Sequence, residues 1–114
     1  MKKIALLSVA CFLFTSLGLL ANGFQEILDA TSKIQEKIKT NKESFCAEFG
    51  EFKKVRNLIL LDEDTDRWTC KSITSPSYLD YLSKIDQFCA DNEQSDLSMI
   101  KDHVDNLLVE LFLE

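Results

Sequence analysis

Apolar side chains recur every three or four positions in successive segments of the chain. In residues 24 to about 42 and again in residues 43 to 61, this spacing places them on one face, with charged residues on the other faces. Such a pattern predicts two amphipathic helices. Their apolar stripes are Phe24, Ile27, Leu28, Ile34 and Ile38 in the first segment, and Phe45, Phe49, Phe52, Val55 and Ile59 in the second.

Two more helices are predicted in the second half of the chain. Ser75 can cap free backbone amides and Pro76 is tolerated at the first helical position, so the third helix is expected over residues 76–90. Ser95 or Asp96 opens the fourth, which has the clearest periodicity of the chain. Residues 62–74 show no sustained period, so a loop is expected there, with a short extended piece around Trp68.

Four helices with short connections predict an all-α, antiparallel helical bundle. The chain has one proline, three glycines and no repeat or low-complexity segment. Residues 24–114 are therefore expected to fold as a single helical domain.

Residues 1–23 have the layout of a secretory signal peptide. Lys2 and Lys3 precede an apolar run, and small residues follow it, with Ala21 and Gly23 at the third and first positions before a cut ahead of Phe24. Cleavage after Gly23 is expected, or alternatively after Ala21. Two other interpretations stay open: residues 4–21 are long enough to remain as a membrane anchor, or Cys11 is acylated.

The charge balance limits the partners of the exported domain. The whole chain has a net charge of −6; without residues 1–23, 11 basic and 19 acidic residues remain and the net charge is −8. A surface of this sign repels nucleic acid and anionic lipid, so neither is an expected partner, whereas a basic protein is compatible with it.

Three cysteines follow the signal, and three pairings are open. An oxidising compartment predicts one disulfide and one thiol that is free or shared with another chain. If the second and third helices are antiparallel neighbours, Cys46 and Cys89 lie at nearly the same height, so we expect a bridge between them. Cys70 is then the odd thiol, and a covalent homodimer through it is one possibility.

No catalytic constellation accompanies these features. The chain has no CxxC pair, a single histidine and no glycine-rich phosphate loop, so we expect no enzyme, metal or cofactor. Trp68, Tyr78 and Tyr81 are expected to be core or lid residues or, if exposed, a contact patch.

The sequence thus favours a periplasmic or extracellular helical protein with a protein partner, as an adaptor, inhibitor or secretion accessory. The compartment rests on the bacterial style of the signal alone. The alternative function is a carrier of a small apolar ligand, because amphipathic helices can also close around a cavity.

Overall fold

A computed structural model of the chain describes residues 23–93 and 95–113. All regular structure in these ranges is helical. The helices are α3 (Phe24–Lys37), α4 (Lys42–Leu61), α5 (Arg67–Ile73), α6 (Pro76–Ala90) and α7 (Ser98–Glu110). The predicted all-α class is therefore confirmed, with five helices in the described ranges where four were expected.

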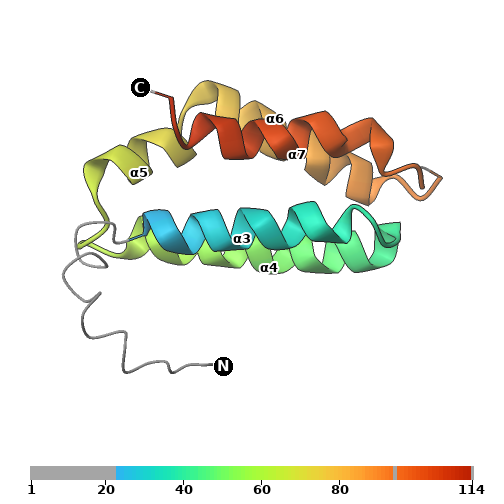
Figure 1. Ribbon diagram of the computed structural model, residues 1–114, viewed down its shortest axis with the longest axis horizontal. Helices are drawn as coiled ribbons and strands as arrows, with labels where there is room; N and C mark the ends of the chain where they lie inside the picture. Colours follow the sequence, from blue (N-terminus) through green and yellow to red (C-terminus); the bar gives the residue numbers. More distant parts are fainter. Residues whose placement is uncertain (1–22, 94, 114) are drawn as a thin grey trace.

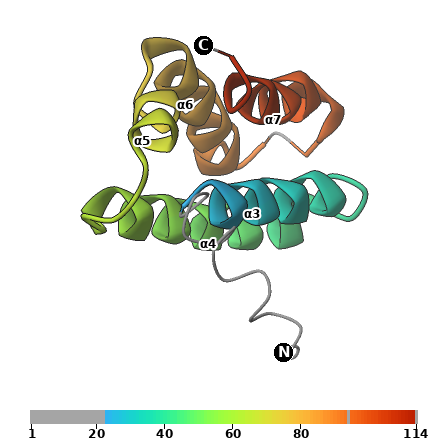
Figure 2. The same ribbon diagram turned by 60° about the vertical axis from the view of Figure 1, so that its left-hand side comes forward.

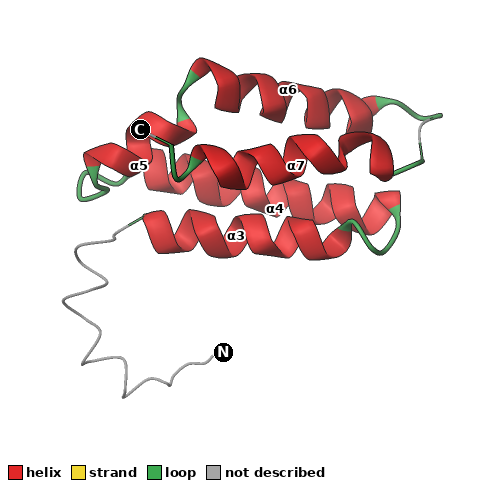
Figure 3. Cartoon of the chain, turned by 45° about the horizontal axis from the view of Figure 1, so that its top comes forward, coloured by secondary structure: helices red, strands yellow, loops and turns green. Residues whose placement is uncertain are grey.

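The helices form two stacked layers. α3 and α4 make one antiparallel hairpin, α6 and α7 make a second, and α3 also packs against α7 (Figures 1 and 2). The short α5 links the end of α4 to the start of α6 (Figure 3). As a result, α3 begins, α4 ends, α6 begins and α7 ends at one end of the bundle, which we call the α5 end.

The core lies between the two layers. α4 contributes three phenylalanines, Phe45, Phe49 and Phe52, whose rings stack in succession with centroids 6.1 and 5.8 Å apart. Aromatic rings bury a large area each, so this row accounts for much of the apolar contact of α4. Tyr78 and the aliphatic residues of the other helices complete the core; the latter include Ile27, Ile34, Ile73, Ile85, Val104 and Leu107.

The third predicted helix is confirmed at both ends. The Ser75 hydroxyl accepts a hydrogen bond from the Tyr78 amide, and Pro76 occupies the first turn of α6. Asn41 caps α4 in the same way, because its side chain accepts from the Ser44 amide at 2.8 Å. These side chains satisfy amides that have no partner within the helix.

The loop predicted over residues 62–74 is wrong for its second half, which forms α5. Asp66 starts this helix: one carboxylate oxygen accepts from the Thr69 amide and the other from the Thr69 hydroxyl, both at 2.8 Å. Trp68 is accordingly helical and not extended. α3 also ends earlier than expected, at Lys37, because residues 38–41 turn the chain into α4.

The predicted signal peptide falls almost wholly on residues 1–22, which lie outside the described residues; so do Cys11 and the Ala21 cleavage position. Only Gly23 of that segment is described. Within residues 23–93 and 95–113, none of the helices combines the length and apolar character needed to cross a bilayer.

Candidate interaction surface

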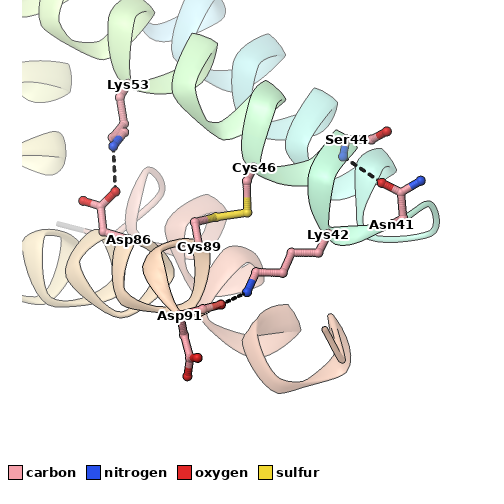
Figure 4. The surroundings of a disulfide bond; sticks show 8 residues. All are labelled: Asn41, Lys42, Ser44, Cys46, Lys53, Asp86, Cys89 and Asp91. Atoms are coloured by element: carbon pink, nitrogen blue, oxygen red, sulfur yellow. Dashed lines mark hydrogen bonds and ion pairs between the residues drawn. A yellow bond between two sulfur atoms is a disulfide. The ribbon is translucent and has the colours of Figure 1, made fainter. Parts of the chain in front are cut away.

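The predicted disulfide between Cys46 and Cys89 is present (Figure 4). It joins α4 to α6, and thus one hairpin to the other, with the two Cα atoms 5.8 Å apart. α4 and α6 run antiparallel, so the two cysteines lie at the same height, as the sequence predicted. A disulfide is consistent with an oxidising, exported location.

Lysines of α4 extend this junction along α6. Lys53 pairs with Asp86 at 2.6 Å, and Lys42 donates to the backbone carbonyl of Asp91 while its ammonium lies 4.8 Å from the centre of the Phe88 ring. Figure 4 shows the Lys53–Asp86 pair and the hydrogen bond from Lys42 to Asp91 on either side of the disulfide. The Lys53 pair is half exposed, so it adds little stability beside a covalent bond.

Trp68 lies at the α5 end and is held at one edge. Its indole Nε1 donates to the carbonyl of Leu111 at 2.9 Å, which ties α5 to the segment that follows α7. The Arg56 guanidinium donates twice to the carbonyl of Ile73, at 3.0 and 2.8 Å, and so fixes the other end of α5 against α4. Trp68 still exposes 44% of its surface. It is thus an oriented aromatic side chain that remains available for contact.

A groove of about 380 Å³ opens beside Trp68. We call it the Trp68 groove. Its lining residues are Trp68, Lys71, Ser72, Ser75, Ser77, Glu110 and Leu113. Leu113 exposes 52% of its surface, and the Ser75 hydroxyl lies 3.4 Å from a carboxylate oxygen of Glu110. The groove therefore combines two apolar side chains with serine hydroxyls and charges of both signs, which suits a mixed apolar and polar ligand.

Two phenylalanines extend the apolar surface towards α3. Phe112 exposes 58% of its surface and meets the ring of Phe24 edge to face, with centroids 5.5 Å apart. Phe112 and Leu113 directly follow Leu111, whose carbonyl accepts the Trp68 indole. Phe24, Trp68, Phe112 and Leu113 therefore gather at the α5 end, and we call these four residues the apolar edge.

The other two aromatic residues of the predicted contact patch do not join Trp68. Tyr78 is fully buried and belongs to the core. Tyr81 is half-buried and stacks on His103 of α7, with ring centroids 6.2 Å apart. Of the two alternatives predicted from the sequence, a core position is therefore correct for Tyr78. Among Trp68, Tyr78 and Tyr81, only Trp68 is exposed.

Cys70 is unpaired and half-buried. It follows Trp68 by two positions, which is about 200° around a helix, so its side chain lies on a different face of α5 from the Trp68 groove. Covalent homodimerisation through Cys70 remains a prediction, and it would use a surface other than the groove.

Two other surface features have a simpler explanation. In the acidic run that precedes α5, Asp62 accepts from the Asp64 amide and Asp66 caps the helix, so these carboxylates organise the turn. A second groove, of about 420 Å³, lies between α3 and α4 with Glu26, Asp29, Glu48, Glu51 and Lys33 on its walls. Both grooves are open to solvent.

The groove residues Lys71, Ser75, Glu110 and Leu113 were not singled out as site residues from the sequence. Glu110 and Leu113 stand some 40 positions from Trp68, and only the return of α7 to the α5 end brings them together. The one signal that could have found them is the apolar triplet of residues 111–113, which continues past the regular stripe of the last helix.

Comparison of the chain with protein-family models, with curated proteins and with solved structures gives no significant match. The residues of the apolar edge and of the Trp68 groove are therefore the basis for a functional proposal.

Proposed function

We propose that this is an exported, non-catalytic protein that binds a protein partner through the Trp68 groove, as an adaptor, an inhibitor or a secretion accessory. The observation that carries the proposal is an exposed tryptophan, fixed by a hydrogen bond to Leu111, on the wall of an open groove. Tryptophan is enriched among the residues that dominate binding energy at protein interfaces. A side chain that is already oriented before binding loses less conformational entropy when it binds.

The composition of the groove suits a peptide or protein segment. Trp68 and Leu113 offer apolar contact, while Ser72, Ser75 and Ser77 can exchange hydrogen bonds with a backbone. Lys71 and Glu110 place opposite charges in the same groove, which would favour a partner in one orientation.

Affinity capture from the native compartment tests this proposal. The wild-type protein should recover a partner at defined stoichiometry, and Leu113→Ser and Trp68→Ala should each reduce recovery at least tenfold, because each removes apolar contact from the groove. Trp68→Ala also removes a hydrogen bond within the fold, so the melting temperature of each variant has to be measured alongside.

Met99→Ser is the matched control. Met99 exposes 55% of its surface and lies at the start of α7, at the opposite end of the bundle. Its replacement should leave recovery unchanged. A partner that binds Leu113→Ser and Trp68→Ala as well as wild type, or repeated failure to recover one, would count against the proposed function.

A further inference from the structure

The point at which the N-terminal segment joins the bundle is fixed. Gly23 is buried, and its carbonyl accepts the Ile27 amide at 3.0 Å in the first turn of α3. Its φ of +91° favours glycine, and a Cβ there would approach the Thr65 methyl carbon to 2.7 Å. Thr65 is itself held by a hydrogen bond to the carbonyl of Ile59. The chain therefore leaves the fold at one defined place.

This exit point lies at the apolar edge. Gly23 directly precedes Phe24, whose ring contacts Phe112. The apolar stretch over residues 4–21 ends two residues before Gly23, a span of at most about 7 Å of chain. The headgroup layer on each side of a bilayer is about 5–8 Å thick. An N-terminal segment inserted into lipid would consequently bring the apolar edge to the membrane surface.

We propose that, while residues 1–22 remain attached, the apolar edge rests on the lipid bilayer, so that lipid covers one border of the Trp68 groove until the segment is removed. The proposal depends on the proposed function in treating this groove as the binding surface, and it assigns a regulation to it. Tryptophan and phenylalanine are well suited to this position, because their rings partition into the membrane interface.

The charges next to the exit point define the kind of membrane. Asp62, Glu63 and Asp64 are exposed and directly precede Thr65, which packs against Gly23. An anionic lipid surface would repel these carboxylates. Vesicles of phosphatidylcholine, which has no net charge, are therefore the appropriate probe, and anionic lipid should weaken the contact.

The only tryptophan of the chain is a built-in reporter, because it belongs to the apolar edge. The full 114-residue chain is reconstituted in phosphatidylcholine vesicles that have bromine on their acyl chains, and flotation shows that the protein is bound. Bromine quenches an indole on close contact. Trp68 should lose at least half of its emission relative to vesicles without bromine, and its emission should shift to shorter wavelength.

The matched control moves the reporter to the other end of the bundle. Trp68→Phe combined with Met99→Trp places the indole at the start of α7, about 17 Å along that helix from its end. This variant should float equally well and keep its emission. A chain that does not float, a Trp68 that is not quenched, or equal quenching of the two reporters would overturn the proposal.

The two proposals fail separately. The lipid experiment contains no protein partner, so its failure leaves the capture result intact. Capture uses protein released from the membrane, and a failure to find a partner does not alter the quenching of Trp68.

Discussion

Tyr78 is a core residue whose side chain contains a polar group. Its ring is fully buried, and its hydroxyl has no hydrogen-bond partner among the described residues. Burial raises the pKa of the Tyr78 phenol well above its usual value, and the charge of Arg56 opposes only part of that rise. The folded protein therefore keeps this phenol neutral under conditions where the unfolded chain ionises it.

This difference predicts a loss of stability in alkali. The pKa of the phenol is higher in the folded state than in the unfolded state. The stability that this group contributes is therefore fully present below about pH 10, which is the pKa of an unfolded tyrosine. Above that pH the unfolded chain loses the proton first, and the free energy of unfolding should fall as pH rises. Urea titrations between pH 8 and 11 measure this fall.

Tyr78→Phe tests the assignment. Because the hydroxyl has no partner in the described structure, its removal should leave stability at pH 7 unchanged or slightly increased, while the alkaline fall becomes smaller. Tyr81→Phe is the matched control at a half-buried site, and it should keep most of the alkaline fall. If Tyr78→Phe lost stability above pH 10 as steeply as wild type, another group would be responsible.

At the scale of the element, α4 contains a residue that weakens it. Gly50 lies in the middle of this helix, and a Cβ added there would have no neighbour within 4 Å. Glycine in a helix interior costs about 1 kcal/mol relative to alanine, mainly through backbone entropy. Gly50→Ala should therefore raise the free energy of unfolding by about 0.5–1 kcal/mol in chemical denaturation.

The same helix provides the control for this prediction. Ala47 is exposed on α4, so Ala47→Gly should lower stability by about 1 kcal/mol. A destabilised Gly50→Ala would mean that the close approach of another chain or segment at this position had been overlooked.

How far a helix could be predicted depended on its length and on its first residues. α6 was predicted from its observed start to about its observed end, because Ser75 and Pro76 mark its start and fifteen residues repeat the period four times. α5 has only seven residues, less than two turns after Asp66, so no period could emerge. Its helical state depends on tertiary contacts, notably those of Arg56 with Ile73 and of Trp68 with Leu111. Such contacts are not visible in a local pattern.

The candidate site was less predictable than the fold for the same reason. Trp68 was singled out as an aromatic residue of the connecting segment, and a contact patch was expected there only if its side chain was exposed. Tyr78 and Tyr81 were grouped with it by proximity in sequence, yet the first turn of α6 points Tyr78 into the core. Glu110, which lines the groove, could not be predicted without knowing that α7 ends at the α5 end.

The whole molecule is two helical hairpins whose joining contacts are unevenly distributed. α3 packs against α7 over an extended interface, whereas α4 and α6 approach closely only around the disulfide and its flanking lysine contacts. Cys46 and Cys89 are 43 positions apart, and closing a loop of this length stabilises a fold by about 4 kcal/mol in the chain-entropy model. That is a large share of the stability of a small domain.

Removal of the disulfide should therefore affect the whole fold. Cys46→Ser and Cys89→Ser should each lower the melting temperature by well over about 10 °C, and the double variant should be no worse than either single one, because all three lose the same bond. Cys70→Ser is the matched control: this thiol is half-buried and unpaired, so the melting temperature should change by only a few degrees, about what a small surface change produces. Calorimetry, with peptide mapping under non-reducing conditions, provides both readouts. Two results would contradict the bridge between Cys46 and Cys89. One is a fall in melting temperature for Cys70→Ser as large as that for Cys46→Ser, and the other is a peptide map that joins Cys70 to Cys46 or to Cys89.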